Sequence, residues 1–178
     1  LGILSYNHNV VVLKNNYDLI PLKKLDTLNI ATLNLSKHFS LQFENATDKY
    51  TKCIHYHFNT FSSSRIMNVM LKELNHYNLI LINTDTIHEN MANFIKSIGK
   101  KKKVILNYNG SEDFPYYKII EPDMNSILYS SSKNKKDLSI SSQIILGGYP
   151  SINKLENDIN NQLKAGNGFL TKKIRLSY

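Results

Sequence analysis

The sequence predicts an α/β domain: a three-layer α/β/α sandwich built around a mostly parallel sheet of five to six strands. Two observations support this class. Short apolar runs alternate along the chain with longer amphipathic stretches, which is the pattern of repeated strand–helix units. Two of the runs, residues 79–82 and 104–106, are apolar at every position, as in strands covered on both faces. At 178 residues, the chain has the length of one domain.

The strands are expected where the apolar runs have strand character, at residues 29–35, 52–58, 78–83, 103–108 and 126–130. A sixth strand, at the edge of the sheet, is expected at residues 172–176, where polar and apolar side chains alternate. Residues 3–13 are ambiguous, because the apolar run that ends this segment suits either a helix end or a strand. Strands alternating with helices in this way favour a flavodoxin-like sandwich.

Three helices are predicted between and after these strands. The first covers about residues 62–74, where three serines offer N-caps to an apolar stripe. The second runs from about residue 87 to 98 and stops at Gly99. The third begins near residue 134 and closes at Gly147-Gly148.

The charge balance is basic, with 22 Lys and Arg against 14 Asp and Glu and a formal net charge of +8. Such a charge attracts anions, so nucleic-acid binding is one hypothesis. Only Arg65 and Arg175 are arginines, however, and the lysines at 100–103 suit a solvated turn between a helix and a strand. We therefore expect no specific nucleic acid as a partner. No apolar stretch is long enough to predict a membrane span.

Motifs for cofactors and covalent catalysis are missing from the sequence: it has no Gly-x-Gly-x-x-Gly, no Walker A loop and no nucleophile elbow. The single cysteine, Cys53, excludes an internal disulfide and is typical of a small buried strand residue. His55 and His57 fall on one side of a predicted strand and could bind a metal, but no third ligand is placed by the sequence. We expect strand histidines there, and neither a metal nor a cofactor.

We take the candidate binding residues from the segments that follow the predicted strands, because ligands of parallel sheets bind beyond the carboxyl ends of the strands. Asp85 and His88 are either an acid–base pair or a helix N-cap with a surface histidine nearby. Glu112 supplies either a carboxylate to a site or a first-turn helix acid. Together with Asn109 and Ser111, these are the five candidate substrate-binding residues. The sequence assigns no catalytic residue.

Several segments, taken in order, resemble the C-terminal domain of glycoside hydrolase family 3. Residues 10–22 and 28–33 are similar to the family's entry, in which a helix ending Leu-Lys-Asn leads through a Leu-Leu-Pro-Leu turn to a strand beginning Ile-Ala. Three later segments resemble further elements of the family, namely two strands, a loop and a helix end; they are residues 77–82, 103–111 and 144–150. The tail, residues 163–178, looks most like the β-N-acetylglucosaminidase branch of Bacteroidetes.

The resemblance implies that residues 1–27 are a linker helix, ending at Lys14-Asn15, and an entry turn, and that residues 28–178 are the sandwich. A (β/α)₈ barrel in the same polypeptide would precede them and carry the catalytic nucleophile. The start without a methionine fits a cut inside a longer chain. The sequence departs from the family at Asn153-Lys154-Leu155-Glu156, where Gly-Lys-Leu-Pro is usual.

The expected function is therefore that of an accessory domain that supports and lines the cleft of a β-N-acetylglucosaminidase or β-glucosidase. The substrate would be a carbohydrate, and this chain alone would be inactive. The parent protein would be periplasmic, outer-membrane-associated or secreted in a bacterium. The alternative is a stand-alone flavodoxin-like domain that binds a ligand or a partner without catalysis.

Overall fold

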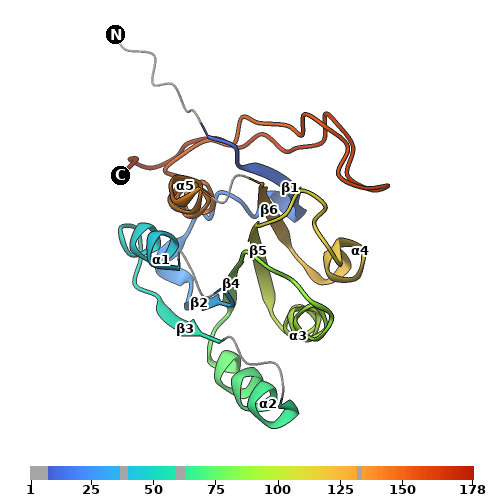
Figure 1. The fold of residues 1–178 in the computed structure, drawn as a ribbon. Helices are drawn as coiled ribbons and strands as arrows, with labels where there is room; N and C mark the ends of the chain where they lie inside the picture. The colour runs from blue at the N-terminus through green and yellow to red at the C-terminus, as the bar shows by residue number, and fades with distance from the viewer. Residues whose placement is uncertain (1–7, 37–39, 59–62, 132–133) are drawn as a thin grey trace.

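The computed structural model describes residues 8–36, 40–58, 63–131 and 134–178 (Figure 1). Its six strands form one sheet in the order β1-β6-β5-β4-β2-β3. The strands are β1 (Val11–Asn15), β2 (Ile30–Asn34), β3 (Ile54–His57), β4 (Leu79–Thr84), β5 (Lys103–Asn109) and β6 (Ser126–Ser130). Strands β2 to β6 are parallel, and β1 pairs antiparallel with β6. The five parallel strands have the flavodoxin-like order.

Helices cover both faces of the sheet in the described parts of the chain. They are α1 (Ser40–Asp48), α2 (Ser64–Glu73), α3 (Glu89–Gly99), α4 (Tyr117–Ile120) and α5 (Lys135–Leu146). Helices α1 and α5 lie on one face, and α2, α3 and α4 lie on the other (Figure 1). The sheet thus separates two buried apolar clusters. The predicted three-layer sandwich with a mostly parallel sheet is confirmed.

The central strands form because their side chains are apolar on both sides. Strand β4 is buried at all six positions. Leu79 and Leu81 pack toward α1 and α5, whereas Ile80 and Ile82 pack into the opposite cluster. Each fully buried side chain of this kind contributes roughly 1.5–3 kcal/mol relative to exposure.

The predicted helices are confirmed, but Ser63 at the start of α2 makes no side-chain capping hydrogen bond. The imidazole of His88 caps α3, where Nδ1 accepts from the backbone N–H of Met91 at 3.4 Å. Helix α5 ends at Gly147, whose φ of +82° is accessible to glycine. Ser62, expected as one of the N-caps of α2, lies outside the described residues. Helices α1 and α4 are not among the predicted elements.

The linker helix expected to end at Lys14-Asn15 is wrong for the described residues, because residues 11–15 form strand β1. Val11 and Leu13 pack into one apolar cluster, and Val10 and Val12 pack into the other. This alternation has the period of a strand, and β6 supplies its pairing partner. The barrel expected before residue 1 stays a prediction.

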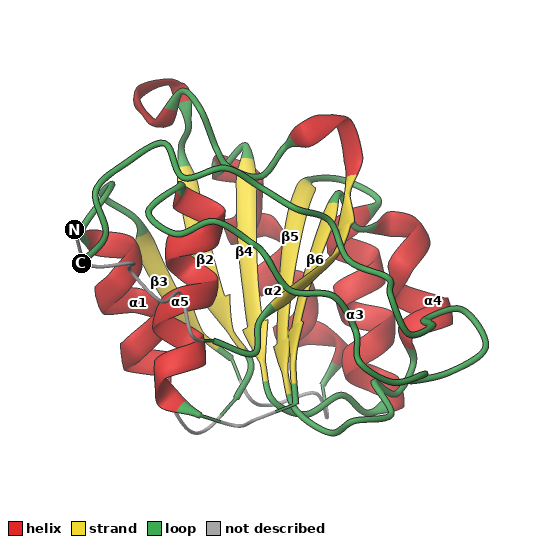
Figure 2. Cartoon of the chain, turned by 90° about the horizontal axis from the view of Figure 1, so that it is seen from above, coloured by secondary structure: helices red, strands yellow, loops and turns green. Residues whose placement is uncertain are grey.

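The edge strand expected at residues 172–176 is also wrong, because this part of the tail has no regular structure. The backbone N–H groups of Ile174 and Arg175 both donate to the carbonyl of Gly147, at 2.8 Å each, and Thr171 donates to Ser151 at 3.0 Å. These bonds are scattered over an irregular partner segment and do not form a ladder. Figure 2 shows the tail as an extended loop that crosses the sandwich. No helix in the described residues is long and apolar enough to cross a membrane.

Candidate functional site

The strand order indicates that a ligand would bind at the carboxyl edge of the parallel strands. The chain adds β3 on one side of β2 and then β4 on the other, so the topological switch point lies between β2 and β4. Ligands of open α/β sheets bind in the crevice outside this point. The candidate residues follow β4 and β5, two neighbouring strands of this edge.

The loops after β4 and β5 lie against each other. A Cβ added at Gly110 would come within 2.4 Å of the backbone oxygen of Asp85, so only glycine permits this approach. The Asp85 carboxylate accepts from the hydroxyl of Thr86 at 2.9 Å. His88, three residues further, is used as the cap of α3. The loop therefore does contain a helix N-cap, but the capping residue is His88 and not the expected Asp or Thr.

The loop after β5 is held in place by the buried side chain of Tyr108. The hydroxyl of Tyr108 accepts from the backbone N–H of Ser111 at 2.9 Å and lies 2.8 Å from its Oγ. The ring of Tyr108 packs on Phe114 with centroids 4.3 Å apart, and burial raises the pKa of its phenol. Asn109 is buried at the end of β5. This rigid base holds Asn109 and Ser111 beside the Asp85 loop.

Three buried asparagines, which the sequence patterns do not single out, form a polar row beneath the switch point. Asn107 Nδ2 donates to Asn83 Oδ1 at 2.8 Å, and Asn83 Nδ2 donates to Asn34 Oδ1 at 3.4 Å. Asn34 Nδ2 then donates to the carboxylate of Glu44 on α1 at 2.5 Å. Each asparagine is at most 1% exposed. Asn107 Oδ1 is buried without a hydrogen-bond partner in the described residues, which is a costly arrangement.

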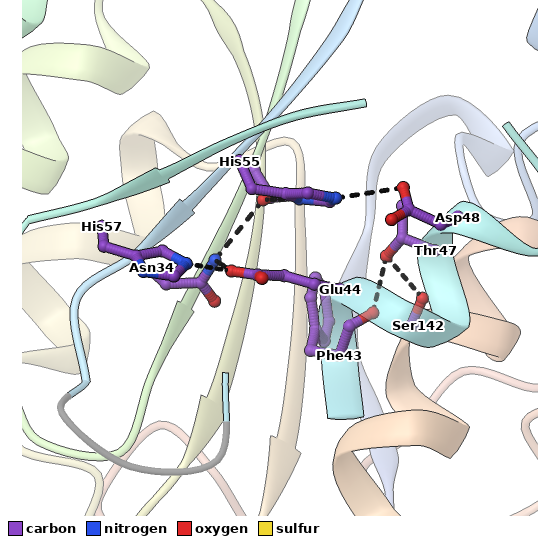
Figure 3. Close-up of polar contacts among 9 residues, drawn as sticks. Asn34, Phe43, Glu44, Thr47, Asp48, His55, His57 and Ser142 are labelled. Carbon is purple, nitrogen blue, oxygen red and sulfur yellow. Dashed lines mark hydrogen bonds and ion pairs between the residues drawn. The ribbon is translucent and has the colours of Figure 1, made fainter. Parts of the chain in front are cut away.

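The polar row reaches the surface through paired histidines and carboxylates (Figure 3). Glu44 Oε1 contacts His57 Nε2, and Asp48 Oδ1 lies 3.0 Å from His55 Nε2. The histidines are two apart on a strand and the carboxylates four apart on a helix, which are matching spans of roughly 6–7 Å. Both histidines of the predicted His55-x-His57 pair therefore bind α1. In the described residues, no three His, Cys, Asp or Glu side chains are grouped to hold a metal ion.

A hollow of about 390 Å³ opens at the other side of the same edge, next to β1 and β6. Its walls include His8 and Val11 at the start of β1, Tyr129 at the end of β6, and tail residues 153–159. Among the five candidate residues, Glu112 is the one that lines it. The tail segment includes Asn153-Lys154-Leu155-Glu156, where the chain departs from the resembled family. No local sequence pattern indicates that this segment folds back onto the strands.

The lining of the hollow includes the apolar side chains of Val11, Leu155 and Ile159, but most of it is polar and carries several carboxylates. Glu112 and Glu156 are exposed, and hydrogen bonding from the backbone N–H of Ala165 lowers the pKa of Asp158. Burial lowers the pKa of His8, whose Nδ1 lies within hydrogen-bond distance of the N–H of Val10 and of Asn153 Nδ2. A neutral imidazole that accepts through Nδ1 fits this geometry. Carboxylates and amides of this kind suit a polyhydroxylated ligand.

Comparisons with known proteins give matches in structure only. No protein-family model and no curated protein sequence matches the chain. A fungal multi-domain GH3 β-N-acetylglucosaminidase is similar over 78% of this chain, with a TM-score of 0.63 and 12% identity. A GH3 β-N-acetylglucosaminidase from Paenibacillus sp. str. FPU-7 is similar over 78%, with a TM-score of 0.60 and 8% identity. A β-glucosidase from Listeria innocua is similar over 80%, with a TM-score of 0.56 and 11% identity.

At these identities the likeness establishes the fold alone. This chain spans 16%, 28% and 24% of the three chains, respectively. Each match is therefore to one part of a larger protein, and the α/β sandwich described above is the part that is shared.

Proposed function

We propose that this chain is an accessory C-terminal domain of a family 3 glycoside hydrolase. The observation that carries the proposal is the likeness of most of the chain to one part of several larger hydrolases, two of them named as members of this family. The ordered sequence resemblance from residue 10 to the tail supports the same family. The absence of a catalytic motif in the sequence fits a domain whose nucleophile lies elsewhere.

The parent protein would cleave β-linked N-acetylglucosaminides or β-glucosides. Retaining hydrolysis uses two catalytic groups about 5–5.5 Å apart on either side of one bond, and a preceding barrel would supply the nucleophile. The carboxyl edge, with Asp85, Asn109, Ser111 and the hollow at Glu112, would line the cleft. The tail favours the Bacteroidetes β-N-acetylglucosaminidase branch, with a parent in the periplasm, on the outer membrane or secreted.

The proposal is tested by assaying two proteins on aryl β-N-acetylglucosaminide and aryl β-glucoside. One is this 178-residue chain, and the other is the longer polypeptide that its gene encodes. We expect hydrolysis by the longer polypeptide and no turnover by the chain. Turnover by the chain alone, or no turnover of either glycoside by the longer polypeptide, would overturn the proposal.

A second candidate is a stand-alone binding domain. The hollow favours it, because its lining presents side-chain carboxylates and amides of this chain to a ligand. Saccharide binding by the chain, followed by chemical shifts of residues around Glu112, together with a gene that encodes no barrel, would establish this alternative over the first proposal.

A further inference from the structure

A second hollow, of about 540 Å³, opens at the amino ends of β5 and β6, on the edge of the sheet opposite the candidate residues. Its volume lies within the roughly 300–1,000 Å³ that is usual for ligand sites. Four consecutive lysines, residues 100–103, line it, and its other described lining residues are Asn16, Gly99 and residues 122–125. We name this place the lysine hollow.

The turns that form the lysine hollow pack closely and are fixed by hydrogen bonds. A Cβ added at Gly99 would come within 2.4 Å of the backbone oxygen of Asp123, so glycine at this position allows the turn after α3 to meet the turn before β6. The backbone N–H of Asn125 donates to the carbonyl of Val104 at 3.0 Å, and its carbonyl accepts from the N–H of Asn16 at 2.9 Å. The hollow is therefore formed in advance of any ligand, which lowers the cost of binding one.

The lining offers hydrogen-bond donors at fixed positions. The Nζ of Lys102 donates to the carbonyls of Asn75 and Tyr77 at 2.8 and 2.9 Å, so the third N–H of this ammonium is left for another acceptor. Asn125 Oδ1 accepts from the backbone N–H of Val104 at 2.9 Å, which fixes the orientation of the amide. Asn125 Nδ2 has no hydrogen-bond partner in the described residues. Both groups can donate to a ligand without breaking a bond of the fold.

The charge of the lysine hollow is strongly positive. Four lysines are opposed by one carboxylate among the described lining residues, that of Asp123, and the lysines at 100, 101 and 103 are exposed. The carbonyls at the end of α3 attract cations, but Lys96 already lies in the last turn of that helix. The helix end therefore does not account for four further lysines. Ammonium groups bind phosphate, sulfate and carboxylate groups as point charges.

The rest of the lining distinguishes between two classes of anion. Nucleic acids are bound through arginine forks and by stacking of bases on aromatic rings, and none of the described lining residues is an arginine or an aromatic residue. The carboxylate of Asp123 would repel a phosphodiester backbone, but it accepts hydrogen bonds from hydroxyl groups. The side-chain amides of Asn16 and Asn125 also suit hydroxyl groups. This lining favours an anion that carries many hydroxyl groups.

We propose that the lysine hollow binds an acidic oligosaccharide. The sulfate, phosphate or carboxylate groups of the sugar contact the lysines, and its hydroxyl groups contact Asp123 and the two asparagine amides. The proposal does not depend on the proposed function, because the hollow lies at the opposite edge of the sheet and glycoside hydrolysis makes no use of it.

The test follows the fluorescence polarisation of a labelled heparin oligosaccharide, a sulfated saccharide, on binding to the 178-residue chain. The hollow variant changes three exposed lysines to glutamine and keeps Lys102, which bonds to the backbone: Lys100→Gln, Lys101→Gln and Lys103→Gln. The control variant removes the same charge at three exposed lysines outside the lining: Lys52→Gln, Lys136→Gln and Lys172→Gln. The hollow variant should bind about tenfold more weakly than the unmodified chain, and the control less than about threefold more weakly.

Equal weakening in the two variants would assign the binding to net charge and overturn the proposal, as would no binding at low salt. Single-stranded DNA of matched charge that binds as tightly, and loses affinity in the hollow variant, would make the site one for nucleic acid and also overturn it. A second measurement is the side-chain NH₂ signal of Asn125 in the nuclear magnetic resonance spectrum. This signal should shift as unlabelled oligosaccharide is added, and an unchanged signal would contradict binding in the hollow.

Discussion

At the scale of single residues, two similar contacts between α1 and β3 differ in burial. The side chain of Glu44 is 7% exposed and that of Asp48 is 49% exposed, and each contacts one histidine. Glu44 also accepts from the buried Asn34, at the end of the asparagine row. The structure therefore predicts unequal energetic roles for the two carboxylates.

We predict that Glu44→Ala lowers the free energy of unfolding by about 3 kcal/mol, because it removes the partner of His57 and leaves the buried Asn34 Nδ2 with only a 3.4 Å contact to Thr32 Oγ1. Asp48→Ala is the matched control on the same helix, and it should cost about 1 kcal/mol or less, as exposed pairs do. Urea denaturation of both variants measures the difference. Equal losses in the two variants would show that the asparagine row does not depend on Glu44.

The residue scale also shows what sequence could not supply. The spacing of His55 and His57 identifies them as a pair without indicating what they contact. Their partners lie on α1, and the sequence does not predict this helix. Only two of its apolar residues, Phe43 and Ala46, are buried, which is too few to give a recognisable apolar stripe. Asn34, Asn83 and Asn107 each occupy the last part of an apolar strand, and no local pattern relates them. Only the register of β2, β4 and β5 brings them together.

At the scale of elements, Gly147 serves both α5 and the tail. It ends the helix at φ +82°, and its carbonyl accepts from Ile174 and Arg175. A Cβ at this position would lie 2.4 Å from Ile174 Cγ1. Gly166 has a similar φ of +87°, but a Cβ added there would meet nothing within 4 Å. An alanine at Gly166 would therefore suffer backbone strain alone, whereas an alanine at Gly147 would suffer the same strain and a steric clash with Ile174.

We predict that Gly166→Ala costs about 1 kcal/mol of stability, the strain of a left-handed alanine. Gly147→Ala should cost about 2–4 kcal/mol, because it adds displacement of the tail to the same strain. Chemical denaturation gives both values, and hydrogen exchange at Ile174 and Arg175 should accelerate only in Gly147→Ala. Similar losses for the two variants would contradict the claim that the tail packs on Gly147.

Elements are predicted best where a single local pattern suffices. The apolar runs of β4 and β5 and the glycine stop of α5 each carry one unambiguous signal. Residues 10–13, three of which belong to β1, are apolar at every position and fit a helix end as well as a strand. The pairing of β1 with β6, more than a hundred residues away, decides the outcome. The tail alternates as a strand does, but its bonding partners near Ser151 are irregular.

At the scale of the whole molecule, the sandwich is complete in its core but contains no assigned catalytic pair. The candidate residues are divided between two places: Asp85, Asn109 and Ser111 lie near the switch point, and Glu112 lines the hollow beside β6. The tail crosses the end of α5 and reaches Tyr50, just after α1, where the rings of Tyr50 and Tyr178 lie 5.2 Å apart. The polar carboxyl edge of the sheet is therefore the candidate site for a ligand.

The central claim is that the nucleophile of the reaction lies outside these 178 residues. The direct measurement is to treat the longer polypeptide with a fluorinated glycoside that traps the glycosyl–enzyme intermediate of retaining hydrolases, and to map the labelled peptide by mass spectrometry. The account predicts one labelled carboxylate, upstream of residue 1. A label on any residue of this chain, Glu112 and Asp85 included, would contradict it.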